Sequence, residues 1–520
     1  MKNLSCLAII SVGFAVNLSA ATVTPATGGN ISADKSANSP NAAWTTLGTI
    51  TLTEVSNGDL AAGTNKTLIV KVPTGFQFNS AAAPAIAFTT KKDISAATIG
   101  ITSNTITATI TVKGVANQDS LTIKSVQIRP LVGTPLAAPG NIYRPTSTNG
   151  GTATIAGITA TANTDGSGGT SFCALTEIGG TPRKLAFATN PAGAVLATVF
   201  TTQPVIRTQD QFGNYSTNGL AATVTVVTSL NTGTGPLLGT RTNNIGTAGA
   251  KGTLTHTNLQ ITTVAGTNYQ LKAVATGFTN GLSAMFAVTK KTPSITWSNP
   301  VAITYGTALS SLQLNATSSV AGAFTYSPVS GTVLNAGTNQ TLSVNFVPTD
   351  TTNYVTNAAS VAINVTKPTL SVVVSNATRP YGLANPTFTG SISGKVNSDN
   401  ITATYGCAAT ATNAAGTYPI VPTLADPGSR LGNYVLSVTN GTLVIQPPAI
   451  PTVTAQRLTN KHVLIQLSGA TNPVYTIQAA NALGAAWTNI GDALMISNKL
   501  TLDDTNAVTR SNRFYRAIVK

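Results

Sequence analysis

The stretch Ile303-Thr304-Tyr305-Gly306 opens a series of short motifs that ends at Val365, and the series begins again at Arg379-Pro380-Tyr381-Gly382 and ends at Ile445. From the tyrosine of the Tyr-Gly pair to the tyrosine of the later Asn-Tyr pair, the distance is 49 residues in the first copy and 53 in the second. A fixed order of motifs at nearly constant spacing indicates one folding unit used twice. The motifs in order are Tyr305-Gly306, Ala336-Gly337-Thr338, Asn353-Tyr354 and Val361-Ala362-Ile363-Asn364-Val365, then Tyr381-Gly382, Ala415-Gly416-Thr417, Asn433-Tyr434 and Thr442-Leu443-Val444-Ile445.

Elsewhere the chain alternates apolar and polar residues, as a strand with one buried face does. The clearest case is Thr105–Val112, where every second residue is a threonine. Charged residues make up 8% of the chain and hydrophobic residues 42%, and there are 46 glycines and 26 prolines. This composition differs from that of disordered chains and favours short strands separated by turns. No region keeps its apolar residues at the helical spacing of 3.6 residues, so we expect few helices. The expected fold is an all-β string of Ig-like β-sandwich domains.

The formal net charge is +15, but the basic residues are spread along the chain. The densest groups are pairs such as Lys91-Lys92 and Lys290-Lys291. The absence of a longer basic run argues against a nucleic-acid-binding arm, so no nucleic-acid partner is expected. A charge of this size favours solubility, and it also permits weak attraction to the anionic polymers of a cell envelope.

Residues 1–21 have the pattern of a secretory leader. Lys2 precedes an apolar segment from Leu4 to Phe14, and Ser19-Ala20-Ala21 supplies the small residues of a cleavage site. Downstream, no uninterrupted apolar stretch reaches the ~18 residues of a membrane-spanning helix. We therefore expect an exported protein, secreted or held at the cell surface, without a transmembrane helix.

Residues that bind metals or carry catalysis are scarce. After the leader the cysteines are Cys173 and Cys407, in different predicted domains, so neither a disulfide framework nor a cysteine metal site is expected. The histidines, His256 and His462, are also in different domains. His256 lies in a strand-like segment and is interpreted as a partly exposed sheet residue.

The 14 acidic residues are spread over the whole chain. A glycosidase needs two carboxylates that flank one bond, and the adjacent pair Asp503-Asp504 is interpreted as a turn. No Gly-x-Ser-x-Gly elbow and no phosphate-binding Gly-x-x-x-x-Gly-Lys-Ser/Thr motif occurs. We therefore predict that the protein is not an enzyme and has no catalytic residues, no cofactor and no metal.

The first two regions resemble bacterial surface modules. Residues 22–180 resemble a sandwich module of bacterial surface proteins through segments 29–34, 72–78, 128–130 and 140–142, and Trp44 is interpreted as a core residue there. Residues 181–291 resemble the Ig-like modules of invasin-type adhesins through 184–187, 203–206 and 210–214.

The invasin-type resemblance implies that Asp210-Gln211-Phe212-Gly213-Asn214 turns between two strands, with Asp and Asn bonding back to the chain and Gly at positive φ. A calcium site at Asp210 is the alternative. We favour the turn, because Ca²⁺ takes six or more oxygens and acidic neighbours are missing.

Through Trp297 and residues 303–309, 312–316 and 347–350, the first repeat copy resembles a bacterial Ig-like repeat. Through Arg379-Pro380-Tyr381-Gly382 and the later motifs of the same copy, the second resembles the related mostly-bacterial-glycine-rich (MBG) repeat. The first copy lacks the Asn-Gly that precedes the last strand of the second, so its hairpin closure must differ. The repeated tyrosines are either ligand platforms or core rings with hydroxyls bonded to backbone, and we favour core rings. The residues that carry the MBG resemblance are Arg379-Pro380-Tyr381-Gly382, Asn385-Pro386, Gly416-Thr417-Tyr418-Pro419-Ile420, Asn433-Tyr434 and Asn440-Gly441-Thr442-Leu443.

Residues 448–520 resemble the small β module that closes many secreted bacterial repeat proteins. The matching motifs are Tyr475-Thr476-Ile477-Gln478, Trp487-Thr488 and the final Arg513-Phe514-Tyr515-Arg516. The terminal position suggests sorting or attachment, and the alternative is a last sandwich that caps the array. Tyr475 and Trp487 are the candidate ligand-binding residues.

Together these observations predict an exported cell-surface or extracellular protein with a structural and adhesive role, acting through multivalent Ig-like modules. The alternative is a polysaccharide-binding accessory protein without catalytic activity. The partner would be an envelope or extracellular polysaccharide or protein, of unknown identity. The predicted parts are 1–21 signal peptide, 22–180 β-sandwich surface module, 181–291 invasin-like Ig-like domain, 292–367 bacterial Ig-like repeat, 368–447 MBG-type Ig-like repeat and 448–520 C-terminal β-sandwich module.

Overall fold

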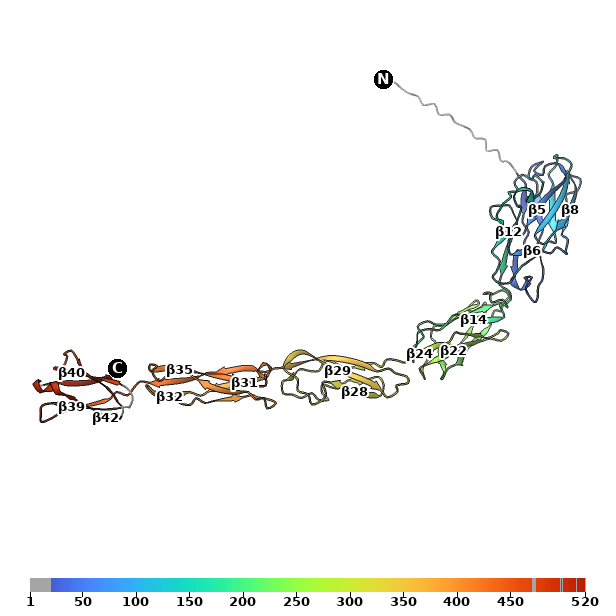
Figure 1. The fold of residues 1–520 in the computed structure, drawn as a ribbon. Coiled ribbons are helices and arrows are strands. Elements are labelled where there is room, and N and C mark those ends of the chain that lie inside the picture. The colour runs from blue at the N-terminus through green and yellow to red at the C-terminus, as the bar shows by residue number, and fades with distance from the viewer. Residues whose placement is uncertain (1–19, 470–473, 496, 498, 511, 520) are drawn as a thin grey trace, which may run out of the picture. The chain divides into compact units, whose positions relative to one another are not determined.

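The structure, a computed structural model, describes residues 20–469, 474–495, 497, 499–510 and 512–519. The predicted leader, 1–21, lies outside the described residues up to residue 19. The described chain is a string of Ig-like β-sandwiches (Figure 1), and its helices are short 3-10 turns. The predicted all-β fold class is confirmed. Two compact units, residues 1–291 with 352–355 and residues 292–351 with 356–520, are each described separately.

The first region of the chain packs three sheets around one apolar core. The sheet orders are β1-β4-β10-β7, β3-β11-β6 and β2-β13-β12-β5-β9-β8. The elements are β1 (Thr22–Thr24), β2 (Asn30–Ser32), η1 (Ala33–Lys35), β3 (Thr45–Thr46), β4 (Ile50–Thr53), β5 (Gly63–Lys71), β6 (Phe76–Phe78), β7 (Ala85–Phe88), β8 (Ile94–Ile101), β9 (Thr105–Val112), β10 (Ser120–Lys124), β11 (Gln127–Pro130), β12 (Gly140–Tyr143), η2 (Ser147–Gly150) and β13 (Ser171–Ile178).

Strand β9 shows how the sequence pattern produces this core. Ile106, Ala108, Ile110 and Val112 are buried, and the four threonines between them are half-buried. Successive side chains of a strand point to opposite faces, so the alternation places every apolar residue on the core side. The strand predicted from the sequence is confirmed residue by residue.

The second region has two cores between its sheets. The sheet orders are β14-β16-β20, β15-β24-β22-β17-β19 with β23 beside β22, and the short pair β18-β21. The strands are β14 (Lys184–Thr189), β15 (Ala194–Val195), β16 (Val205–Gln209), β17 (Thr225–Thr232), β18 (Leu237–Leu238), β19 (Thr242–Asn244), β20 (Thr253–Thr255), β21 (Gln260–Ile261), β22 (Gly266–Val274), β23 (Gly281–Leu282) and β24 (Phe286–Thr289).

The repeat recognised in the sequence is also a repeat of strand topology. The main sheet has the order β26-β30-β29-β28 in the first copy and β32-β37-β35-β34 in the second, and in both the strand at the Tyr-Gly motif pairs in parallel with the closing strand. The strands are β25 (Ile295–Thr296), β26 (Ile303–Thr304), β27 (Thr317–Ser318), β28 (Gly322–Ser327), β29 (Gly337–Pro348), β30 (Asn357–Thr366), β31 (Thr369–Val374), β32 (Ala377–Pro380), β33 (Gly390–Ser393), β34 (Thr402–Gly406), β35 (Gly416–Ala425), β36 (Val435–Thr439) and β37 (Gly441–Gln446), with η3 (Leu431–Asn433).

The two copies differ where the sequence indicated that they would. In the second copy β36 leads through Asn440-Gly441 into β37. In the first copy the Asn-Tyr motif is followed directly by β30, so no strand corresponds to β36. The second sheet is therefore β25-β27 in the first copy and β33-β31-β36 in the second.

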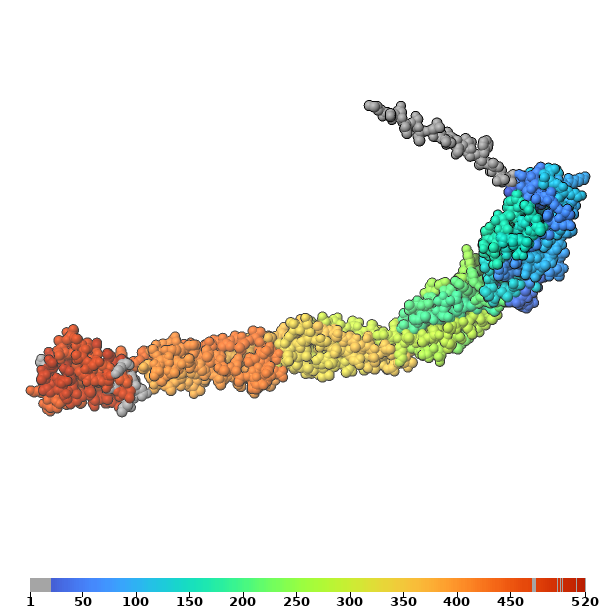
Figure 2. All heavy atoms as spheres, turned by 45° about the horizontal axis from the view of Figure 1, so that its top comes forward, coloured from blue at the N-terminus to red at the C-terminus, as the bar shows by residue number. Residues whose placement is uncertain are grey.

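Tyrosines from both copies meet in one shared core. The hydroxyls of Tyr305 and Tyr434 donate to Asp399 Oδ2 at 3.0 and 2.7 Å, and the rings meet edge to face with centroids 5.5 Å apart. Both rings are buried. In Figure 2 the atoms of these two copies, yellow and orange, lie in contact. Core placement of these two tyrosines is confirmed. The Tyr434 hydroxyl also has the expected backbone partner, since it accepts from Val396 N at 3.0 Å, and the shared Asp399 carboxylate is a partner that was not expected.

The last module is a sandwich of two three-stranded sheets, β38-β39-β42 and β41-β40-β43. The buried residues between them include Ile465, Leu467 and Ile477. The elements are β38 (Thr452–Arg457), β39 (Val463–Ser468), β40 (Val474–Ala480), β41 (Thr488–Leu494), β42 (Lys499–Asp504), η4 (Thr505–Thr509) and β43 (Phe514–Val519).

Candidate functional site

Tyr475, one of the two candidate ligand residues, lies in the core of the last module. Its relative exposure is 0%, and its hydroxyl donates to the Ala449 carbonyl oxygen at 3.1 Å. Burial raises the pKa of this hydroxyl above its ordinary value. A side chain with no exposed surface contacts no ligand in this state, so the structure gives Tyr475 a packing role.

The final Arg513-Phe514-Tyr515-Arg516 motif is explained by its alternation across β43. Arg513 Nε pairs with Asp504 Oδ2 at 2.6 Å, and the Tyr515 hydroxyl donates to the same oxygen at 3.0 Å. Asp504 is 4% exposed, so this is a buried ion pair that joins the two sheets. Burial and the neighbouring carboxylate raise the pKa of Tyr515 to about 12.

The position of Asp504 corrects one expectation. Asp503-Asp504 was expected to be a turn, but both residues belong to β42. Asp504 Oδ1 also accepts a hydrogen bond from Asn506 N at 3.1 Å and so caps η4. The carboxylate therefore belongs to a strand end, a helix cap and an ion pair together.

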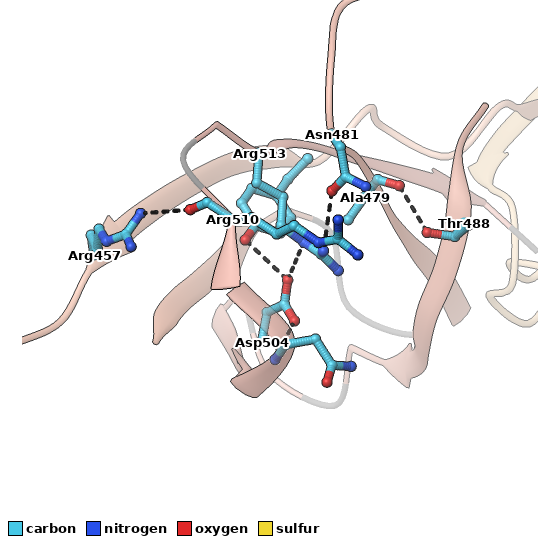
Figure 3. A network of polar contacts seen from close by, with 9 residues as sticks. Arg457, Ala479, Asn481, Thr488, Asp504, Arg510 and Arg513 are labelled. Carbon is cyan, nitrogen blue, oxygen red and sulfur yellow. Dashed lines mark hydrogen bonds and ion pairs between the residues drawn. The ribbon is translucent and has the colours of Figure 1, made fainter. Parts of the chain in front are cut away.

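Further polar contacts fix the strands around Asp504 (Figure 3). Arg513 Nη1 donates to Asn481 Oδ1 at 3.4 Å, and the Thr488 hydroxyl donates to the Ala479 carbonyl at 3.0 Å. Arg457 Nη1 donates to the Arg510 carbonyl at 3.3 Å. The first two bonds link the ends of β40, β41 and β43, so the outer face of that sheet is a preorganised surface, whereas Arg457 lies on β38 of the other sheet.

That outer face carries Trp487, the second candidate residue. The Arg516 guanidinium lies 4.4 Å from the centre of the Trp487 ring, and Arg516 Nε donates to Gln478 Oε1 at 2.8 Å. Gln478 Nε2 in turn donates to Asn489 Oδ1 at 2.7 Å. Gln478 pairs in register with both Arg516 and Asn489, so three strands present one polar row beside an aromatic ring. We name Trp487, Arg516, Gln478 and Asn489 the Trp487 platform.

A similar set occurs in the first region of the chain. The Arg129 guanidinium lies 4.0 Å from the centre of the Trp44 ring. With the Gln77 amide turned so that its oxygen faces the guanidinium, Arg129 Nε and Nη2 donate to it at 2.8 and 3.1 Å. Arg129 and Gln77 are register partners on β11 and β6. We name Trp44, Arg129 and Gln77 the Trp44 platform.

The Trp44 platform also corrects a prediction. Trp44 was interpreted as a core residue, but its side chain is partly exposed. It precedes β3, which pairs with β11 so that Thr45 faces Ile128, and this register brings Trp44 to Arg129. An aromatic ring under a cation gains stabilisation at a surface, so it does not need the core.

The Asp210 segment forms the predicted turn. Asp210 N donates to the Asn214 carbonyl at 3.0 Å, and Gly213 has φ +94°. Asp210 Oδ1 accepts from the N–H groups of Phe212 and Asn214, both at 2.9 Å. Oδ2 accepts from Gly180 N at 2.8 Å and from Asn214 Nδ2 at 2.9 Å. Both oxygens are committed to N–H donors, which favours the turn over the calcium alternative.

His256 is buried, at 3% exposure, although a partly exposed residue was expected. Its Nε2 lies 3.0 Å from the Thr228 hydroxyl and its Nδ1 lies 3.2 Å from the Thr240 carbonyl. Burial lowers the pKa of the ring, so the neutral form donates from Nδ1 and accepts at Nε2. These two partners account for both ring nitrogens.

The described residues contain no group of three or more His, Cys, Asp or Glu side chains placed to hold a metal ion. Cys173 is buried, and burial raises the pKa of its thiol to about 11, which disfavours the reactive thiolate. In the part of the chain that the structure describes, no helix has the length and apolar character needed to cross a membrane.

Comparison with known proteins gives one family match. Residues 370–444 match the family described as "MBG domain (YGX type)". This confirms the resemblance found in the second repeat copy, over that part of the chain. A comparison with curated proteins finds no match.

Several solved structures are similar to the chain at low identity. Domains 4–9 of the surface layer protein SbsC are 13% identical, with 96% of this chain and 82% of that chain covered and a TM-score of 0.22. The Escherichia coli adhesin FdeC is 12% identical, with coverage of 81% and 96% and a TM-score of 0.19. The FN1–FN3 domains of chicken CNTN1 are 8% identical, with coverage of 65% and 98% and a TM-score of 0.14. Scores this low carry no argument about function, which must come from the residues themselves.

Proposed function

We propose that this protein is an exported cell-surface or extracellular protein with a structural and adhesive role, whose Ig-like modules make several weak contacts in parallel. The observation that carries the proposal is a series of sandwiches, of which only the two repeat copies are described as sharing a core, with polar, largely uncharged outer faces. Strand β9, with its half-buried threonines, shows such a face. Weak contacts on one chain add through effective concentration.

The same observations support a protein without enzymatic activity. The buried carboxylate of Asp210 stabilises a turn, and that of Asp504 caps a helix and pairs with an arginine. His256 is held by two neutral partners. A reacting group has to come within hydrogen-bond reach of a substrate, and Asp210, Asp504 and His256 are all buried.

A second candidate function is that of a polysaccharide-binding accessory protein without catalytic activity. Trp487 on its preorganised sheet face favours it, because an aromatic ring beside amide and guanidinium groups is suited to sugar rings and their hydroxyls. The last module would then attach the chain to a polymer. The alternative is that the module only caps the array.

A sedimentation assay tests the proposal. Residues 22–520 are mixed with envelopes of the host and, separately, with insoluble polysaccharides, at low and high salt. The adhesive role predicts retention on envelopes that persists at high salt. Retention on one polysaccharide alone would favour the accessory role. Binding that disappears with salt would be explained by net charge alone, which is +14 for residues 22–520 because the +15 of the full chain includes Lys2, and it would contradict both roles.

A further inference from the structure

Two parts of the chain that are distant in sequence contain the same constellation of residues. In each, a tryptophan precedes a threonine at the start of a strand, and an arginine lies over the ring. A glutamine in register with that arginine accepts a hydrogen bond from its Nε. The two sets are the Trp487 platform and the Trp44 platform. The modules that carry them have different sheet topologies, so the shared fold does not by itself require the set.

The chemistry of the Trp487 platform favours an anionic ligand with planar geometry. Stacking on the ring and the bond to Gln478 fix the Arg516 guanidinium, and among the described residues Nη1 and Nη2 have no hydrogen-bond acceptor. Two parallel N–H donors in a fixed plane match the two oxygens of a carboxylate. Holding the guanidinium in advance lowers the entropy lost on binding.

The surroundings of Arg516 suit a sugar acid better than an isolated anion. Gln478 and Asn489 extend the row with amides, which bond to hydroxyl groups, and Trp487 is a partly exposed aromatic ring beside them, with Arg516 over one of its faces. Residues 448–520 carry seven Lys or Arg and three Asp. Asp492, in the next row, accepts from the Thr476 hydroxyl at 2.6 Å and restricts how far an anionic chain extends in that direction.

We propose that the Trp487 and Trp44 platforms both bind the carboxylate groups of an acidic polysaccharide built from uronic acid units, so that one polymer engages the chain at two modules. This deepens the proposed adhesive function and rests on it. The Trp487 platform is the stronger of the two, because Gln77 already occupies Nε and Nη2 of Arg129 whereas Gln478 occupies only Nε of Arg516.

The test uses residues 22–520 and immobilised polygalacturonate, with its methyl ester as the neutral polymer of the same backbone. The account predicts binding to the acid form and at least about tenfold weaker binding to the ester, because esterification removes the carboxylate that pairs with the arginine. Equal binding to both polymers overturns the proposal, since it shows that the carboxylate is not recognised.

Variants locate the binding. Arg516→Gln should weaken binding about tenfold and Arg129→Gln by about threefold, with the double variant weaker than either. Arg516→Lys keeps the charge without the fork and should also weaken binding. Arg457→Gln, on the opposite sheet of the last module, is the control with the same loss of charge and should bind as the unchanged chain does.

Thermal unfolding separates a ligand site from a structural contact. Each variant is compared with the unchanged chain for both melting temperature and affinity. Lost affinity at an unchanged melting temperature supports the proposal. Full affinity in Arg516→Gln, or an equal loss in Arg457→Gln, overturns it. If the chain is still retained on envelopes in the sedimentation assay but does not bind polygalacturonate, the ligand class is wrong and the adhesive role stands.

Discussion

Replacing Glu177 by glutamine should make the first region less sensitive to pH. Glu177, on β13, is 3% exposed, and its Oε2 accepts a hydrogen bond from Ala137 N at 2.6 Å. Its Oε1 has no partner among the described residues. Burial raises the pKa of Glu177 to about 7 from 4.5, and the nearby charge of Asp210 adds to the increase.

The direction and size of the effect follow from linkage. Between pH 4.5 and about 7 the folded chain retains the Glu177 proton while the unfolded chain loses it, so the free energy of unfolding falls as the pH rises through this window. At about 1.4 kcal/mol per pKa unit, the loss attributable to Glu177 is on the order of 3 kcal/mol. Glu177→Gln keeps an acceptor for Ala137 N and removes the ionisation.

Urea unfolding measured by tryptophan fluorescence from pH 4.5 to pH 8.5 provides the assay. The unfolding transition of the first region is identified as the one that disappears from the fluorescence signal when Trp44 is replaced by Phe. Burial also raises the pKa values of Glu54 and Asp119 in the same region, so the diagnostic quantity is the difference between Glu177→Gln and the unchanged chain. The variant should gain relative stability as the pH rises. A difference that does not change with pH refutes the reasoning.

Three further substitutions test other parts of the fold. Tyr434→Phe removes the hydroxyl that donates to Asp399 and should destabilise the repeat pair by about 1–2 kcal/mol, measured by urea unfolding. Asp504→Ala leaves the Arg513 guanidinium without its buried partner and should cost the last module about 3 kcal/mol, measured by thermal unfolding. Gly213→Ala places a side chain at φ +94° and should cost about 1–2 kcal/mol in the second region, measured by urea unfolding.

The Gly213 prediction has a control variant, and each of the three predictions has a contradicting result. Gly100→Ala, at a site with open space and ordinary φ, should be nearly neutral, and an equal cost would show that Gly213 is not chosen for its conformation. Unchanged stability in Tyr434→Phe would mean that the shared core does not depend on the hydroxyl. Unchanged stability in Asp504→Ala would mean that the buried pair contributes nothing net.

The local parts of this fold could be predicted from the sequence. Strand β9 follows its threonine alternation, and the Asp210 turn follows from residues that bond within five positions of one another. The repeat motifs indicated a shared topology, and the missing Asn-Gly indicated that the copies would close differently. Such features depend on near neighbours, which the sequence shows directly.

The candidate site depended on pairings that the sequence does not show. The register of β3 and β11 brings Arg129 to Trp44, and the sequence does not show this register. Trp44 was therefore assigned to the core. Tyr475 was a candidate ligand residue, but the alternation of β40 turns it inward. Arg516 and Gln478 were noted only as parts of motifs, and the alternation of β43 was the available signal that Arg516 lies opposite in orientation to Arg513 and Tyr515.

The most direct test of the proposed function compares two forms of the same partner. The apparent affinity of residues 22–520 is measured for intact envelope particles of the host and for small soluble fragments of those envelopes, each of which engages one module. If several weak modules act together, affinity for the particles should exceed that for the fragments by about a hundredfold or more, at constant salt. Equal affinities would contradict the account, because they would show that one site accounts for all binding.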